Sequence, residues 1–267
     1  MLVNYHCHSL CSMDGEASMA DMALAGVRAG VGLICFTDHC DTVGDYGEPR
    51  REFSWEAVEG ALEEARRAVG ERAELRKGVE LGCATLHPAY ALEILSRPGI
   101  DFVIGSIHNA PFGPDYYFMN FTDPAECRKL LEEYFLQMLC LARTDLWDVL
   151  GHLNYPLRYM RWRDGVEVDL DDCRDLLDLI LRTAIESGRG VELNTSGYLN
   201  CGGEPLPPRS ILLRYRELGG EIITIGSDAH IPARMGQGLA DGMELLRDTG
   251  FRYLTVYRER KPEFIRL

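Results

Sequence analysis

Six of the seven histidines stand where a short apolar segment gives way to polar residues: His6, His8, His39, His108, His152 and His230. Glu80 lies at the end of a further apolar segment, and Asp228 follows the same segment as His230. Imidazole nitrogens and carboxylate oxygens together suit zinc, iron and manganese, and one carboxylate can bridge two ions. Because such ions activate water as a nucleophile at neutral pH, these residue types predict a hydrolytic metal centre.

A single histidine is more often a core or surface residue than a ligand. His87, in Leu86-His87-Pro88 near a predicted helix start, is interpreted in that way and left outside the site. The other six repeat one arrangement at the ends of successive strands, which makes coincidence a poor explanation for them. Cys7 lies between His6 and His8 but points away from both if the segment is extended, so it is not counted as a ligand.

The elements that must position these residues alternate between short strands and amphipathic helices. Strands are predicted over residues 2–5, 31–36, 74–81, 102–105, 146–150, 190–193 and 222–225, with a strand-like segment at 253–256. Helices are predicted from Ser18 to Gly30 and over residues 54–70, 87–96, 124–143, 169–187, 209–218 and 237–248. Ser18 and Asp123 fit helix N-caps, and Gly30 fits the position just past a helix end.

Seven consecutive strand–helix units require a parallel sheet with helices outside, and such a sheet is open or closed into a barrel. The polar residues favour the barrel, because each follows the C-terminal end of its strand. Those ends meet at one mouth in a closed barrel, whereas opposite edges of an open sheet lie too far apart to share ligands. We therefore expect an α/β barrel that spans residues 1–267 as a single domain.

Composition excludes several classes of function. A formal net charge of −14 disfavours nucleic acid as a partner, because its binding needs clustered lysine and arginine. No apolar run approaches 18 residues, and the N-terminus lacks a basic segment followed by an apolar stretch, so no membrane association or signal peptide is expected. The nine cysteines form no Cys-x-x-Cys pair and are interpreted as free thiols, which fits a cytoplasmic protein.

The ordered motifs resemble the PHP (polymerase and histidinol phosphatase) superfamily over nearly the whole chain. The matching pieces are His6-x-His8, Thr37-Asp38-His39, Glu80, His108, Gly151-His152 and Ser227-Asp228-Ala229-His230. Residues 191–197 and the run from 215 to 230 are similar to the histidinol-phosphatase branch in particular. The resemblance implies a distorted, TIM-like (β/α)7 barrel that holds two or three divalent metal ions, with zinc, iron and manganese all acceptable.

The resemblance also implies how the metal ligands divide. One ion would take His6, His8, Glu80 and Asp228; a second would share Glu80 and add His108 and His152; a third would take Asp14, His39 and His230. Asp14 precedes Gly15 in a loop, where an aspartate is also a common turn residue. Asn4 stands where the family usually has an aspartate, and its amide can accept a hydrogen bond but carries no charge.

The leading hypothesis is hydrolysis of a small phosphate monoester, with L-histidinol phosphate as the first candidate. Arg158 is the expected clamp for the phosphoryl oxygens, ahead of Arg161, Arg163 and Arg234. Asp228 and His230 are the candidates for proton transfer to the leaving group. Further substrate contacts are assigned to Asn194 and Ser227, with Asp45 and Glu48 as additional candidates for the ammonium and imidazole groups.

Two alternatives remain open from the sequence alone. The chain could act on another small phosphate ester or a nucleotide, which a substrate panel would separate from histidinol phosphate. It could instead be a non-catalytic metal-binding module, although decayed sites lose ligands and all nine candidate positions are filled here. The residues do not identify the metals or the oligomeric state.

Overall fold

The central sheet of the computed structural model, which describes residues 1–267, has seven parallel strands in the order β1-β2-β4-β5-β6-β7-β8. Their bounds are β1 Leu2–Asn4, β2 Val31–Phe36, β4 Glu74–Gly82, β5 Phe102–Ser106, β6 Val149–Leu150, β7 Gly190–Asn194 and β8 Ile223–Gly226. The short strand β3 (His39–Asp41) follows β2 and pairs with the end of β4. Because the order of strands follows the sequence, each crossover connects two neighbouring strands.

Backbone hydrogen bonds between the first and last strands of this sheet turn it into a barrel. They run from Tyr5 N to Ile225 O (2.8 Å), from Asp228 N to His6 O (2.7 Å) and from His8 N to Ala229 O (2.9 Å). The bonds lie just beyond the end of β1 and at or just beyond the end of β8, so the barrel closes toward its C-terminal mouth rather than along whole strands. The predicted (β/α)7 barrel is confirmed, and its distortion lies at this seam.

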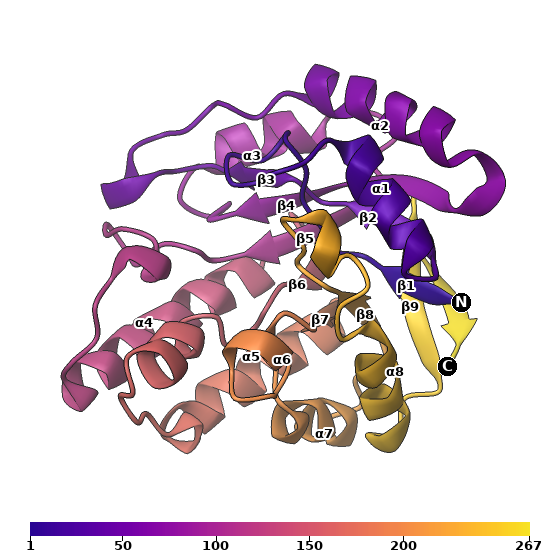
Figure 1. Ribbon diagram of the computed structural model, residues 1–267. Coiled ribbons are helices and arrows are strands. Elements are labelled where there is room, and N and C mark those ends of the chain that lie inside the picture. The colour runs from indigo at the N-terminus through magenta and orange to yellow at the C-terminus, as the bar shows by residue number, and fades with distance from the viewer.

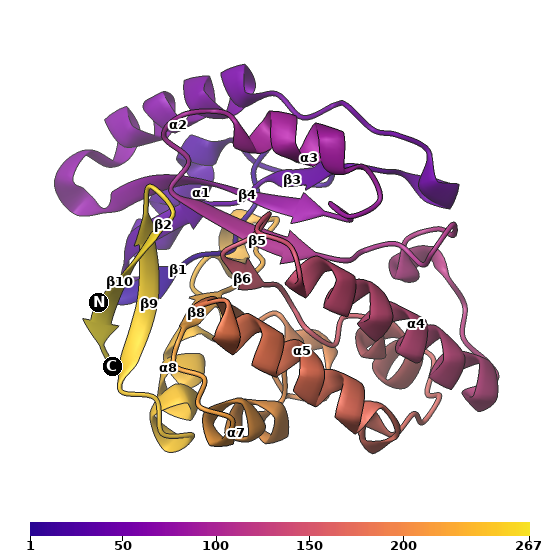
Figure 2. The same ribbon diagram turned by 180° about the vertical axis from the view of Figure 1, so that it is seen from behind.

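The helices surround the barrel, as Figures 1 and 2 show from opposite sides. They are α1 Met19–Arg28, α2 Trp55–Val69, α3 Pro88–Leu95, α4 Pro124–Ala142, α5 Arg174–Glu186, α6 Gly197–Asn200, α7 Arg209–Glu217 and α8 Leu239–Asp248. The predicted caps are present: Ser18 Oγ accepts from Asp21 N, and Asp123 Oδ1 accepts from Ala125 N. Local capping signals therefore fixed these helix starts. None of the helices combines the length and apolar composition that a bilayer span requires.

Some elements differ from the prediction. The expected strand over 146–150 shrinks to β6, because the Asp148 carboxylate accepts from Val103 N and replaces part of the ladder with a side-chain contact. The residues after His152 form a π-helix, Arg158–Arg163, where a loop was expected. The last strand-like segment is one arm of a hairpin, β9 (Tyr253–Arg258) with β10 (Lys261–Arg266).

This C-terminal hairpin lies beside β1 and β8, where Figure 1 shows both chain termini on the same side of the molecule. Arg76, on β4, is buried there and donates to Tyr5 Oη (2.8 Å) and to the Tyr257 carbonyl (2.5 Å). The Tyr5 hydroxyl also donates to the Tyr257 carbonyl (3.0 Å). These contacts close the end of the barrel opposite the strand C-termini, which leaves one open mouth.

Candidate metal centre

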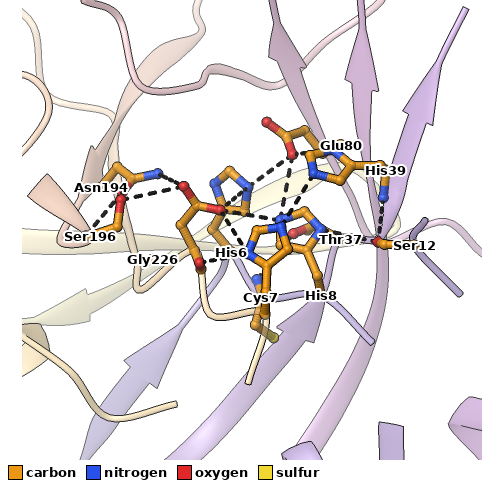
Figure 3. A network of polar contacts seen from close by, with 12 residues as sticks. His6, Cys7, His8, Ser12, Thr37, His39, Glu80, Asn194, Ser196 and Gly226 are labelled. Atoms are coloured by element: carbon orange, nitrogen blue, oxygen red, sulfur yellow. Dashed lines mark hydrogen bonds and ion pairs between the residues drawn. The ribbon is translucent and has the colours of Figure 1, made fainter. Parts of the chain in front are cut away.

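Glu80, near the end of β4, lies at the centre of a cluster of histidines (Figure 3). Its Oε2 lies 2.9 Å from His39 Nδ1, 3.1 Å from His6 Nε2 and 3.5 Å from His8 Nε2. Its Oε1 lies 2.9 Å from His152 Nε2 and 3.1 Å from His108 Nε2. The carboxylate is fully buried, so it joins two groups of imidazoles without contact with solvent.

Two aspartates complete the cluster, one beside His6 and His8 and the other beside His39 and His230. Asp228 Oδ1 lies 3.3 Å from His8 Nε2 and 3.6 Å from His6 Nε2. Asp14 Oδ2 lies 3.2 Å from His230 Nε2 and 3.5 Å from His39 Nε2, although half of the Asp14 side chain is exposed. The structure therefore brings all nine predicted ligands to one mouth, including Asp14 from its loop.

The backbone at Asp228 has a φ of 53°, in the left-handed region that a non-glycine residue rarely occupies. Its amide nitrogen donates to His6 O across the closing seam of the barrel, which holds this conformation. Strained backbone of this kind gathers at functional sites, where the surrounding structure maintains it. The strain here directs the carboxylate toward His6 and His8.

The buried donor atoms fit bound metal ions. Nε2 of His6, Nε2 of His8, Nδ1 of His39 and Oε2 of Glu80 are all buried, and although they lie close together none of them makes a hydrogen bond of acceptable geometry. Buried polar atoms normally have partners, so four orphaned atoms that face one another need an explanation. Two ligands of one tetrahedral zinc ion lie about 3.3 Å apart, and the separations around Glu80 and Asp228 fall close to that value.

The carboxylates and imidazoles of the cluster shift one another's pKa values. Burial opposes ionisation of Glu80, but His6, His108 and His39 hold its pKa well below the usual range. Burial likewise opposes a charge on His6, but the carboxylates of Glu192, Glu80 and Asp228 raise its pKa well above the usual value. For His8, burial and the neighbouring imidazoles of His230 and His39 lower the pKa well below the usual value. The carboxylates thus remain ionised only beside positive charge, which a metal ion also supplies.

Two acidic residues that the sequence reasoning did not assign hold histidine rings in place. Glu192 Oε1 lies 2.6 Å from His6 Nδ1, and its Oε2 accepts from His152 N at 2.9 Å. Asp41 Oδ1 lies 2.8 Å from His108 Nδ1. A carboxylate on the second ring nitrogen is how metal-ligating histidines are usually oriented. A buried glutamate in β7, between Val191 and Leu193, was the available sequence signal for the first of them.

Asn4 joins the two strands that close the barrel. Its Oδ1 accepts from Ser227 N (3.0 Å) and His6 N (3.2 Å), while its Nδ2 donates to Ser227 Oγ (2.7 Å) and Met235 O (3.0 Å). The carbonyl oxygen thus accepts hydrogen bonds as expected, and the amide donors have partners that a carboxylate could not serve. Asn4 contacts the backbone of His6 and not its ring, so it supports the backbone on which the ligands stand.

We expect Asn4→Asp to lower the free energy of unfolding by about 1–3 kcal/mol, because a buried carboxylate would face the Met235 carbonyl without a proton to share. Denaturant unfolding of the two proteins measures this difference. Asn200→Asp makes the same chemical change at an exposed position and should shift stability by less than about 0.5 kcal/mol. Unchanged or higher stability of Asn4→Asp would contradict the role of the amide donors.

A pocket of about 380 Å³ opens over the cluster. Its lining includes Asp14, His39, His108, His152, Asp228 and His230 on the metal side, and Arg158, Tyr155, Tyr159, Tyr117 and Phe118 on the other. This volume lies at the small end of ~300–1,000 Å³, the usual range for ligand pockets. A small phosphorylated molecule fits such a space.

Arg158 is the arginine that the structure brings to this pocket. It begins the π-helix, an element that often occurs at functional sites, and its side chain is mostly buried. Its Nη2 donates to Ser196 Oγ (2.6 Å) and lies 3.7 Å from Asp228 Oδ2, and its Cζ lies 5.6 Å from the centre of the Tyr155 ring. Its Nε is buried without a partner. A guanidinium that lines a pocket is suited to an anion.

The other predicted substrate contacts lie outside the pocket lining. Asn194 is buried behind Asp228, and its Nδ2 donates to Asp228 Oδ2 at 3.1 Å. Ser227 is buried, and its hydroxyl accepts from Asn4. Asp45 and Glu48 are exposed on the loop before α2. These four residues were assigned by their sequence neighbours, and barrel closure turned the two buried ones away from the pocket.

The remaining candidates are also located elsewhere. Arg161 is half exposed and pairs with Glu167, Arg163 donates to the carbonyls of Tyr117 and Met119, and Arg234 is exposed in a 3-10 turn. His87 precedes α3 and contacts Tyr90, away from the cluster. Cys7 Sγ lies 3.5 Å from the Cys35 carbonyl, and Figure 3 shows its side chain directed away from the histidine rings, as predicted.

Comparison with known proteins agrees with this geometry. The family model described as "PHP domain" matches residues 4–196. The chain therefore belongs to the PHP domain family, which confirms the resemblance seen in the sequence.

Several individual relatives are named for one branch of this family. A protein of Clostridium acetobutylicum named "Probable histidinol-phosphatase" is 30% identical over 250 residues, covering 92% of each chain. A Thermotoga maritima protein of the same name is 29% identical and covers 96% of this chain and 95% of its own. The crystal structure of a histidinol phosphate phosphatase from Lactococcus lactis, complexed with zinc, L-histidinol and phosphate, superimposes with a TM-score of 0.83 at 24% identity, covering 98% of both chains.

Proposed function

We propose that this protein is a histidinol-phosphate phosphatase that converts L-histidinol phosphate and water into L-histidinol and inorganic phosphate, in histidine biosynthesis. The observation that carries the proposal is a pocket that opens over a cluster of nine metal-type ligands, six of which line it, and that has Arg158 on its other side. Relatives named as histidinol-phosphatases support the choice of substrate, because this chain aligns with more than nine-tenths of the length of each. We also propose that residues 1–267 act as one phosphoesterase domain in the cytoplasm, where the nine unpaired thiols would be stable.

We propose one divalent ion for each of the three ligand sets that the family resemblance implies. The sets are His6, His8, Glu80 and Asp228; Glu80, His108 and His152; and Asp14, His39 and His230. Zinc, iron and manganese all suit these nitrogen and oxygen donors. When bound, such ions neutralise phosphoryl oxygens and make water a stronger nucleophile at neutral pH.

The protein's own residues bind and orient the phosphate ester and transfer protons. Arg158 binds non-bridging phosphoryl oxygens, and Tyr155, under its guanidinium, fixes the direction of approach. Water attacks phosphorus, the bond from phosphorus to the alcohol oxygen breaks, and a proton passes to the leaving oxygen. Asp228 and His230, which both line the pocket, are the groups that we propose for this proton transfer.

Arg158 also belongs to a chain of hydrogen bonds that ends at the metal cluster. Arg158 donates to Ser196 Oγ, Ser196 Oγ donates to Asn194 Oδ1 (2.5 Å), and Asn194 donates to Asp228. Figure 3 shows Ser196 and Asn194 next to each other at one edge of the cluster. This chain couples the position of the guanidinium to that of Asp228. Asn194 and Ser196 thus act by holding two groups that face the phosphate.

We expect Arg158→Lys to lower kcat/KM by about two orders of magnitude, because an ammonium cannot present two parallel donors to a phosphoryl group. The loss should be similar for histidinol phosphate and for an aryl phosphate, since both carry the same phosphoryl group. Arg161→Lys changes the neighbouring, half-exposed arginine and is the matched control. A loss confined to one of the two substrates would show that Arg158 contacts the leaving group instead.

Phosphate release from L-histidinol phosphate, nucleotides, sugar phosphates and an aryl phosphate tests the proposed substrate. We expect histidinol phosphate to exceed the other esters by orders of magnitude in kcat/KM. Cleavage without that preference would favour a PHP phosphoesterase for another small ester or a nucleotide. Metal binding without cleavage of any ester would favour a non-catalytic metal-binding module.

A further inference from the structure

Four carboxylates line the pocket, and three of them have partners in the metal cluster. Asp14 faces His39 and His230, Asp41 faces His108, and Asp228 faces His6 and His8. The fourth, Asp115, contacts no histidine and forms no ion pair with any lysine or arginine. Neither the metal centre nor the phosphate clamp accounts for this carboxylate.

Asp115 is held in place by neutral donors. Its Oδ1 accepts from Tyr117 N at 2.7 Å and from the Tyr155 hydroxyl at 3.0 Å, and no group donates to its Oδ2. Burial raises the pKa of Asp115 above its usual range, only partly offset by His108 and the Tyr117 backbone. A carboxylate that is largely desolvated without a countercharge gains stability when a cation binds to it.

Tyr155 places Asp115 relative to the reaction centre. Its ring packs against His152 (4.9 Å between centroids) and His108 (5.5 Å), with the Arg158 guanidinium over it. Its hydroxyl points to Asp115. Asp115 is therefore separated from the phosphate clamp by about one tyrosine side chain, the reach of a short amino alcohol phosphate.

Aromatic side chains extend from Asp115 to the pocket rim. Tyr117 and Phe118, the two residues after Tyr116, line the pocket although they are 57% and 68% exposed. The Tyr117 ring lies edge-on to both Phe118 (5.0 Å) and Tyr159 (5.7 Å). Exposed aromatic rings at a pocket rim offer faces to a flat or cationic group of a ligand.

We propose that Asp115 binds the ammonium group of the leaving alcohol, while Tyr117 and Phe118 contact its flat ring. This inference rests on the proposed function for the identity of the alcohol, and it makes the protein selective for cationic esters over neutral ones. Phosphoryl binding and leaving-group recognition are then separate, with Arg158 and the metal ligands serving the first and Asp115 serving the second. Tyr155 is a positioning residue between them.

The test pairs one substitution with one change in the substrate. Asp115→Asn keeps an acceptor for Tyr155 and Tyr117 but removes the charge, and the substrates are L-histidinol phosphate and its analogue without the amino group. We expect kcat/KM for histidinol phosphate to fall about 10- to 100-fold in Asp115→Asn, and kcat/KM for the amine-free analogue to change less than about threefold. Glu52→Gln removes an exposed carboxylate outside the pocket and should leave both values unchanged.

The possible results distinguish a failure of the role proposed for Asp115 from a failure of the proposed substrate. Equal losses on both substrates would overturn it, because Asp115 would then be supporting the metal cluster through Tyr155. No loss on either would also overturn it. If wild-type protein does not prefer histidinol phosphate, the same comparison with a simple aminoalkyl phosphate and its amine-free counterpart decides the role of Asp115 independently of the biological substrate.

Discussion

Replacing Glu80 with glutamine is expected to lower kcat/KM by at least about three orders of magnitude, more than removal of one transition-state donor usually costs. Both oxygens of this buried carboxylate face imidazole nitrogens: Oε2 faces His6, His8 and His39, and Oε1 faces His108 and His152. A neutral amide offers one weaker oxygen and an NH2 group that binds no cation. Two of the three proposed ions share Glu80, so elemental analysis of the variant should show less metal per chain.

Glu192→Gln is the matched control for this experiment. Glu192 is equally buried and of the same type, but it contacts the second ring nitrogen of His6 and the backbone of His152 rather than the atoms proposed to bind metal. We expect a loss of about 10- to 100-fold, as is usual when a group that orients a ligand is changed. If Glu80→Gln kept both its metal content and activity within tenfold of the wild type, Glu80 would not be a shared ligand.

Removal of the metals by a strong chelator is expected to abolish phosphatase activity and to lower the melting temperature on the order of 10 °C. An ion present at ~1,000 times its Kd stabilises the folded state by ~4 kcal/mol, and in a chain of this size each kcal/mol shifts the midpoint by roughly 2–4 °C. Without ions, the buried carboxylate of Glu80 depends on protonated histidines for countercharge, and that of Asp228 depends on histidines and Arg158. Differential scanning calorimetry with and without chelator measures the shift.

Readdition of zinc, iron or manganese should restore both properties, and the ion that restores activity best identifies the working metal. The Glu80→Gln protein is the control, because its melting temperature should respond less to the chelator. Full activity in protein shown by elemental analysis to be free of metal would rule out the proposed chemistry. A restored melting temperature without restored activity would point to a structural role for the ions.

The sequence by itself determined the strand–helix alternation and the identity of the nine candidate ligands. Strands β2, β4, β5, β7 and β8 lie within one residue of their predicted bounds, because apolar runs and capping residues are local signals. The ligands were found for the same reason: in a parallel barrel every strand ends at the same mouth, so a position in the sequence implies a position in space. Even Asp14, in a loop, followed from the family pattern.

Only the tertiary structure decided which side chains face one another across the barrel. Asn194 and Ser227 stand beside ligands in the sequence, but closure of the barrel directs one to Asp228 and the other to Asn4. Glu192 lies in a family-like stretch that assigned it no role, and Asp115 carries no local motif. Their side-chain contacts with His6 and Tyr155 span 40 or more positions in the sequence. Such contacts depend on how the strands close and on where the π-helix places Arg158, and neither is encoded in the spacing of nearby residues.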